Sequence, residues 1–135
     1  MGRLDGKVAI ITGGNSGVGA ATAVKFAAEG AKFVITARRV APLEEVAAKI
    51  REAGGEVLAI ASDISKADDA KKVVADTLAE FGKIDILINN AGVLDSGLKA
   101  IDSFTDDDMK KFIDINTKGT MCMLREVTAE MAKTG

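Results

Sequence analysis

Four runs of apolar, mostly β-branched residues divide this chain, and a longer segment with helical character follows each of them. The first run has no polar alternation, which is typical of a strand covered on both faces. Strands that alternate with helices pair in parallel through right-handed crossovers. The pattern therefore predicts an α/β fold in which one parallel sheet carries helices on both faces. The four predicted strands are residues 7–12, 32–37, 56–61 and 84–89.

The first two helices are bounded by residues that commonly start or end helices. One helix is predicted over residues 16–29, and Gly30 follows it as a terminating residue. The next helix is expected to begin near Pro42, because proline is tolerated in a first helical turn. It should stop at Gly54, one residue before a second glycine.

The last two helices have candidate caps. Residues 65–68, Ser-Lys-Ala-Asp, resemble a capping box for a helix that runs to Phe81 and ends at Gly82. Thr105 is expected to cap a long final helix. Three aspartates, residues 106–108, occupy its first turn and complement the positive end of the helix dipole.

Length and composition fit one ordinary domain, residues 1–135, and argue against several functions. A net charge of −2 leaves no basic stripe for nucleic acid. The chain has no histidine and one cysteine, Cys122, so no metal site is expected. The first apolar run is too short for a signal peptide or a membrane span. We therefore expect a cytoplasmic protein with no nucleic-acid or membrane partner.

A glycine-rich segment, residues 12–19 (Thr-Gly-Gly-Asn-Ser-Gly-Val-Gly), joins the first strand to the first helix. Glycines let a backbone turn sharply and approach a pyrophosphate, and the N–H groups of the helix N-terminus favour an anion. The segment is no P-loop, because no Lys-Ser or Lys-Thr pair follows the glycines. It predicts a dinucleotide site. The alternative is a tight turn that binds no ligand.

The end of the second strand bears on the choice of dinucleotide. An acidic residue about 20 positions after the glycines commonly binds the ribose 2′-hydroxyl of NAD. This chain has Ala37 there, followed by Arg38 and Arg39. An arginine can bind a 2′-phosphate bidentately, which favours NADP over NAD and makes Arg38 the preferred ligand. Alternatively, both arginines belong to a solvated loop.

These motifs resemble those of the short-chain dehydrogenase/reductase family. Residues 12–19 match its T-G-x-x-x-G-x-G motif, and residues 89–92 match its N-N-A-G motif. The resemblance implies that Asn89 holds neighbouring strands together and that Thr12 ties the two loops to each other. It also implies a Rossmann-like, doubly wound sheet and a bound dinucleotide. The implied cofactor-binding residues, besides Arg38, are Gly13, Asn15, Ser16, Gly17, Val18, Gly19, Asp63, Ile64, Asn90, Ala91 and Gly92.

The family's catalytic residues are matched at one position only. Asn116 falls where the family has its active-site asparagine, although a polar residue inside a long helix is also typical of a surface position or a local bend. Family enzymes carry a serine on the fifth strand and a Tyr-x-x-x-Lys pair on the next helix. This sequence has no tyrosine and ends at Gly135, where that strand would begin. We therefore predict that the chain is inactive alone.

By family analogy the four strands lie in the order 3-2-1-4, which places the fourth strand at an edge. That strand is apolar, and exposed apolar edges invite pairing. The sequence thus predicts a truncated half-domain that binds dinucleotide and forms a homodimer through strand four or the last helix. The alternatives are a fragment that is active only with a complementary C-terminal half, a self-associating structural scaffold, and a complete monomeric unit.

Overall fold

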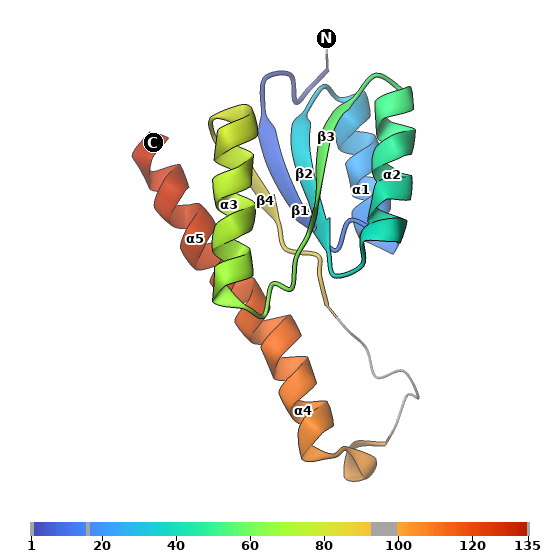
Figure 1. Ribbon diagram of the computed structural model, residues 1–135, viewed down its shortest axis with the longest axis vertical. Coiled ribbons are helices and arrows are strands. Elements are labelled where there is room, and N and C mark those ends of the chain that lie inside the picture. The colour runs from blue at the N-terminus through green and yellow to red at the C-terminus, as the bar shows by residue number, and fades with distance from the viewer. Residues whose placement is uncertain (1, 16, 93–99, 135) are drawn as a thin grey trace.

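The computed structural model describes residues 2–15, 17–92 and 100–134 and contains one four-stranded parallel sheet. The strand order is β3-β2-β1-β4, which confirms both the predicted α/β class and the predicted order. Helices cover both faces of the sheet (Figure 1). The strands are β1 (Val8–Thr12), β2 (Lys32–Ala37), β3 (Glu56–Ala61) and β4 (Ile86–Ile88).

Three of the strands match their predicted bounds to within a residue, whereas β4 is shorter than predicted. It pairs with β1 only from Ala9 to Ile11. At the start of β4, the Asp85 carboxylate accepts the N–H of Val8 at 2.9 Å. Beyond its end, the Thr12 hydroxyl accepts a backbone N–H of the following loop at 3.0 Å. At the start of β4 the side-chain bond adds to a backbone bond from the N–H of Asp85 to the carbonyl oxygen of Val8, whereas beyond its end a side chain takes over the pairing. A strand pattern in the sequence does not reveal either bond.

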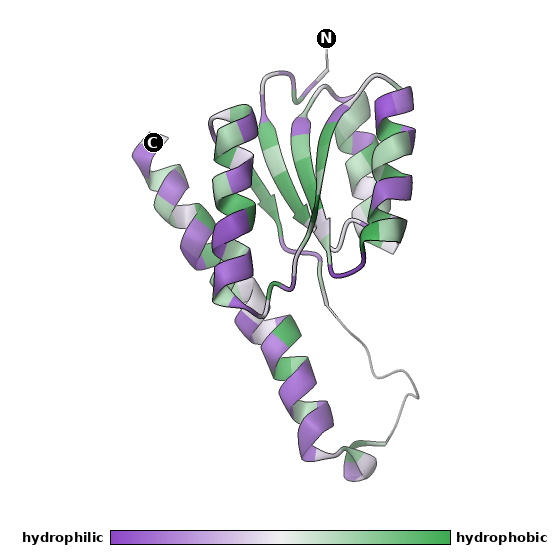
Figure 2. Cartoon of the chain, in the orientation of Figure 1, coloured by the Kyte–Doolittle hydropathy of each residue, from purple (hydrophilic) through white to green (hydrophobic). Residues whose placement is uncertain are grey.

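Two apolar clusters fill the space between the sheet and its helices. α1 (Gly17–Ala28) and α2 (Val40–Glu52) lie on one face, over Phe33 and its neighbours. α3 (Ala67–Phe81) and α5 (Thr120–Thr134) lie on the other face, where Met123 is fully buried. Figure 2 shows the strands as the hydrophobic centre, with hydrophilic residues along the helices. The burial of successive β1 residues on alternate faces explains their continuous apolar run.

The helix termini confirm two predictions and correct one. Thr105 and Asp108 form a reciprocal capping box at the start of α4 (Asp106–Phe112). Gly82 ends α3 in the left-handed conformation, with φ of +81°. The predicted capping box at residues 65–68 is wrong. Lys66 is the N-cap of α3 without a side-chain cap, because the Ser65 hydroxyl donates to Asp63 instead.

The final helix begins at Thr105 as predicted, but it is not a uniform α-helix. α4 continues into a π-helical segment, η2 (Ile113–Gly119), and then into α5, while a short 3₁₀ turn, η1 (Ile101–Ser103), precedes α4. In Figure 1, α4 extends beyond the carboxyl ends of the strands, whereas α5 lies beside α3. Within the described residues, no helix combines the length and apolar character that crossing a membrane requires.

Candidate functional site

A cleft with a volume of about 500 Å³ opens at the carboxyl ends of β1, β2 and β3. The loops that follow the four strands form its sides, and η2 supplies one further wall. Open α/β sheets bind their ligands at this edge. Its lining residues are Gly13, Asn15, Thr36, Ala37, Arg38, Arg39, Ser62, Asp63, Ile64, Ala91, Gly92 and Ile115.

The glycine loop after β1 packs directly against the loop after β4. Gly13 has φ of +69°, and a Cβ atom there would lie 2.9 Å from the Cα of Ala91. A Cβ on Gly19 would overlap the carbonyl oxygen of Gly13 and lie 2.5 Å from the side-chain nitrogen of Asn90. Only residues without a side chain allow this approach, which holds the first turn of α1 close to both loops.

Thr12 ties these two loops together, as the sequence predicted. Its hydroxyl oxygen accepts the backbone N–H groups of Asn90 and Ala91, each at 3.0 Å. The Asn90 side chain donates to the carbonyl oxygen of Gly13 at 3.1 Å. The side chains of Thr12 and Asn90 therefore both connect the loops, whereas Asn89, the residue expected to hold strands together, is exposed.

The two arginines after β2 lie at the rim of the cleft and are exposed. Arg39 is the N-cap of α2 and has extended backbone geometry. Arg38 lies near enough to Asp63 for its charge to lower the pKa of that carboxyl group. A guanidinium at this position gives the rim a fixed positive charge beside a carboxylate.

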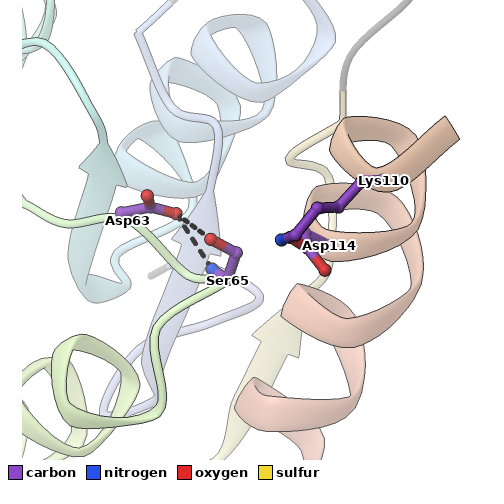
Figure 3. Close-up of polar contacts among 4 residues, drawn as sticks. All are labelled: Asp63, Ser65, Lys110 and Asp114. Carbon is purple, nitrogen blue, oxygen red and sulfur yellow. Dashed lines mark hydrogen bonds and ion pairs between the residues drawn. The ribbon is translucent and has the colours of Figure 1, made fainter. Parts of the chain in front are cut away.

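Asp63 is held in place by the turn that follows β3 (Figure 3). One of its carboxylate oxygens accepts the N–H of Ser65 at 3.0 Å and the hydroxyl of Ser65 at 2.6 Å. Burial raises the pKa of Asp63, but these hydrogen bonds and the charges of Lys66 and Arg38 together outweigh burial and lower it. Asp63 therefore carries a negative charge at neutral pH, and its position is fixed.

Thr36 and Ser62 belong to the cleft although sequence reasoning did not select them. Thr36 is 1% exposed and Ser62 is 7% exposed, and both line the cleft. Among the described residues, neither hydroxyl oxygen has a hydrogen-bond partner. The sequence signal that could have identified them is a polar residue at or just after the end of an apolar strand. Such a residue also occurs in ordinary strands that are covered on both faces, so the signal is weak.

Asn116 lies in the π-helical segment η2, at an exposed position. Its side chain reaches the loop after β4, because a Cβ on Gly92 would lie 3.2 Å from the Asn116 amide oxygen. One residue earlier, Ile115 is buried and lines the cleft. Lys110 and Asp114 form an ion pair on the preceding turns, and Figure 3 draws both side chains. Within the described part of the chain, no group of three or more His, Cys, Asp or Glu side chains is placed to hold a metal ion.

The structure thus brings most of the predicted site residues together at the cleft. The described ones that are not part of its lining are Gly17, Val18, Gly19, Asn90 and Asn116. Gly19 and Asn90 support the loops from behind. Gly17 begins α1, and Val18 is 74% exposed on its first turn. Ser16 lies outside the described residues. The predicted residues that line the cleft are Gly13, Asn15, Arg38, Asp63, Ile64, Ala91 and Gly92.

Comparison with known proteins identifies the family. The family model described as short chain dehydrogenase matches residues 7–135. A curated relative, an uncharacterized oxidoreductase of Listeria innocua, is 38% identical over 118 residues, which are 87% of this chain and 47% of the relative. A metagenomic short-chain oxidoreductase in complex with NADP is 36% identical with a TM-score of 0.90, over 97% of this chain and 59% of that chain.

A short-chain dehydrogenase/reductase from Burkholderia phymatum in complex with NAD is 31% identical with a TM-score of 0.93. The match covers 99% of this chain and 47% of that chain. This chain therefore spans about half the length of the relatives that it matches. The family model covers nearly all of its residues. The chain belongs to the short-chain dehydrogenase family.

Proposed function

We propose that residues 1–135 form a single dinucleotide-binding unit that holds NADP in the cleft at the carboxyl edge of the sheet. The observation that carries the proposal is the junction of the two loops. The bonds from Asn90 and Ala91 to Thr12 fix the loop after β4 against the glycine loop. Because Gly13 and Gly19 have no side chains, the two loops pack closely at the N-terminus of α1. The N–H groups of a helix N-terminus favour an anion such as a pyrophosphate.

The residues of the cleft fit such a group in size and chemistry. A volume of about 500 Å³ lies within the usual range of small-molecule sites. Ile64 and Ile115 offer apolar surface to a planar base, and Gly92 adds no side chain to the lining. When bound, the dinucleotide supplies the hydride-transfer chemistry of the family. The described residues bind and orient it.

The preference for NADP rests on the end of β2. Ala37 provides no carboxylate to bind a ribose 2′-hydroxyl, and Arg38 follows it at the rim. A carboxylate at this position would repel a 2′-phosphate, whereas a guanidinium can form two parallel hydrogen bonds to it. Both cofactors occur among the structural relatives, one with NADP and one with NAD. We therefore base the proposed preference for NADP on the positive charge of Arg38 at the rim of the cleft.

Calorimetric titration with NADPH and with NADH tests the proposal directly. We expect NADPH to bind the 135-residue chain and NADH to bind at least tenfold more weakly, since hydrogen bonds to charged groups contribute about 1.5–3 kcal/mol. Gly13→Val should abolish both titrations, because its side chain would meet the backbone of Ala91. The absence of binding by the wild-type chain at millimolar nucleotide would contradict the proposal.

We further propose that this chain has no turnover by itself. It contains no tyrosine and no histidine, so the acid–base group of the family reaction is missing from these residues. Loss of a general acid–base group costs on the order of 10²- to 10⁴-fold in rate. Oxidation of NADPH by the purified chain with a panel of carbonyl compounds would overturn this view. Activity that returns when a chain with the family's Ser and Tyr-x-x-x-Lys residues is added would support a complementing fragment.

The exposed face of the last helix favours self-association as a second function. Met121 is 63% exposed and Leu124 is 43% exposed, and the two lie one turn apart on α5. On η2, Ile113 is 59% exposed. The residues of β4 are half-buried, so α5 is a better interface than that strand. We propose a homodimer through α5, and sedimentation velocity tests it.

In that experiment, Met121→Glu and Leu124→Glu should each shift the chain toward the monomer. Val24→Glu is the matched control, because Val24 is 53% exposed on α1, on the opposite face of the sheet. A wild-type chain that stays monomeric at high concentration would contradict the homodimer. An equal effect of all three substitutions would assign the association to general surface hydrophobicity.

A further inference from the structure

β3 forms one edge of the sheet, and part of its backbone points away from the sheet. Its one strand partner within the described residues is β2. The N–H of Ser62 donates toward β2, to the carbonyl oxygen of Ala37 at 2.9 Å. Because the backbone groups of successive strand residues point to opposite sides, Ala61 and Ala59 direct their N–H and C=O groups outward. In Figure 1, β3 is the strand drawn in front, between α3 and α2.

One end of this edge is covered by a side chain, and the other end is open. Near the amino end of β3, the Arg51 guanidinium donates to the carbonyl oxygen of Val57 at 3.1 Å and pairs with Glu44. Edge strands are commonly protected in this way, or by charged side chains and proline. Toward the carboxyl end, the outward-facing residues are Ala59 and Ala61, which offer neither protection. The open part of the edge is therefore available for pairing.

A groove with a volume of about 510 Å³ lies along this open part. It is lined by residues 58–61 of β3 and by Lys72, Asp76, Ala79 and Glu80 of α3. The strand side of the groove is apolar, whereas the α3 side carries charges. An extended strand suits such a place, because its backbone can pair with β3 while the flanking side chains select the partner.

We propose that the strand that pairs here is β3 of a second copy of this chain, antiparallel to the first about a two-fold axis at Ile60. In that register Ala59 of each copy lies opposite Ala61 of the other, and each such pair exchanges both N–H···O bonds. The two Ile60 residues form the central pair, in which side chains lie close together. The inference goes beyond the proposed function and requires neither the dinucleotide nor the interface at α5.

The charges on α3 favour a second copy over an unrelated strand. The two-fold axis is perpendicular to the joined sheet, so the two α3 helices lie on the same face and run in opposite directions. The α3 side of the groove is basic toward the start of the helix, at Lys72, and acidic toward its end, at Asp76 and Glu80. Reversal in the second copy places each basic end opposite an acidic end. The groove is thus complementary to itself, which favours this pairing and its register.

Sedimentation velocity tests the pairing in a parent chain that carries Met121→Glu and Leu124→Glu, so that association through α5 does not contribute. We expect the parent to form dimers. Ala61→Pro should raise the dimer dissociation constant at least about tenfold, because it removes an outward N–H. An edge strand accepts proline where the lost N–H faces solvent, so the monomer should stay folded. Where both interfaces form, the chain without the α5 substitutions should reach a tetramer.

Charge reversal on α3 provides a second test in the same parent. Lys72→Glu should weaken the dimer by a similar factor, because it places acidic residues opposite each other. Adding Asp76→Lys should recover the dimer, since the opposite charges face each other again. Lys71→Glu is the matched control, because Lys71 is exposed on α3 but is not part of the groove lining.

Amide hydrogen exchange in the parent chain tests the register without a substitution in β3. Exchange at Ala59 and Ala61 should slow as the chain concentration rises, because dimerisation satisfies their outward N–H groups. Exchange at Ile60 is the internal control, since its N–H already points toward β2. If Ala61→Pro prevents folding, this measurement decides.

The inference is wrong if the parent chain sediments as a monomer at high concentration. It is also wrong if the parent forms dimers but exchange at Ala59 does not depend on concentration. Either result leaves the proposed NADP site and the α5 interface untouched, because neither uses the outer edge of β3. Conversely, a chain that binds no dinucleotide but shows concentration-dependent protection of Ala59 and Ala61 overturns the proposed function alone.

Discussion

The hydroxyl oxygen of Thr12 accepts the backbone N–H of Asn90 at 3.0 Å, although 78 positions separate the two residues in the chain. The bond joins the carboxyl ends of β1 and β4, beyond the last backbone pair between Ile11 and Ile88. One side chain thereby takes the place of a strand ladder. The loop after β4 is held where it forms one side of the cleft.

Thr12→Val should destabilise the chain by about 1–3 kcal/mol, because the N–H of Ala91 would lose its acceptor and the N–H of Asn90 would keep only the carbonyl oxygen of Ile88. Urea denaturation followed by circular dichroism measures the change. Thr12→Ser keeps the hydroxyl and should recover most of the loss. A value for Thr12→Val within 0.5 kcal/mol of wild type, as is usual for surface substitutions, would mean that the tie contributes nothing to stability.

Gly19→Ala should lower both stability and NADPH affinity, although alanine normally stabilises a helix by about 1 kcal/mol relative to glycine. The new methyl group would overlap the carbonyl oxygen of Gly13 and press on the side chain of Asn90. Ala21→Gly, at an exposed position of α1, is the control. This control should lower stability only by the difference in helix propensity between alanine and glycine, and it should leave the affinity for NADPH unchanged. Stabilisation by Gly19→Ala would contradict the close approach of the loops.

Arg38→Ala should weaken NADPH binding by about 10- to 100-fold and leave NADH binding nearly unchanged, because a charge-assisted bond to the 2′-phosphate is lost. Arg39→Ala is the matched control at the neighbouring rim position. We expect a change of about threefold or less there, since exposed charge pairs contribute about 0.2–1 kcal/mol. Equal losses for both cofactors would show that Arg38 contacts a part of the ligand that NADP and NAD share.

Acid should destabilise the chain partly through Asp85, at the opposite edge of the sheet. Burial raises the pKa of Asp85, but hydrogen bonds from Lys83 and from the N–H of Val8 outweigh it and lower that pKa. A carboxyl group whose pKa is lower in the folded state than in the unfolded state stabilises the fold when the pH is above the unfolded-state pKa of about 3.9. This stabilisation is lost as the pH falls toward the folded-state pKa.

We therefore expect the free energy of unfolding to decrease from about pH 5 to pH 3. Asp85→Asn should flatten that decrease and cost about 1 kcal/mol at pH 7. Lys83→Ala removes the ion pair and leaves the bond to Val8, so it should flatten the decrease by a smaller amount. Equal pH profiles for wild type and Asp85→Asn would show that the depression of the pKa is too small to matter.

Sequence patterns predicted the core of this fold because a strand that is buried on both faces appears in the sequence as a continuous apolar run. The residues of β2 and β3 were placed at their observed bounds, since apolar runs end at Ala37 and Ala61, where the sheet ends. The end of α3 at Gly82 was also predictable, because a helix commonly ends in a left-handed residue and glycine adopts that conformation without strain.

Sequence patterns missed features in which a side chain could form a hydrogen bond with more than one group. Ser65 was expected to cap α3, but its hydroxyl lies 2.6 Å from an Asp63 carboxylate oxygen, and a charged acceptor forms the stronger bond. That the buried hydroxyls of Thr36 and Ser62 have no partner among the described residues was not predictable, because a short strand pattern does not tell which buried hydroxyls find a partner. That depends on contacts between distant segments.

The π-helical segment between Phe112 and Thr120 joins α4 to α5 within one continuous helix. A π turn holds one residue more than an α turn, and each residue of an α-helix advances the chain by about 100° around its axis. Removing one residue from Ile113–Gly119 would therefore restore a regular helix and leave α4 and α5 in nearly the same relative orientation. In this helix the π segment absorbs an additional residue, so that α4 keeps its direction while α5 keeps its packing on the sheet.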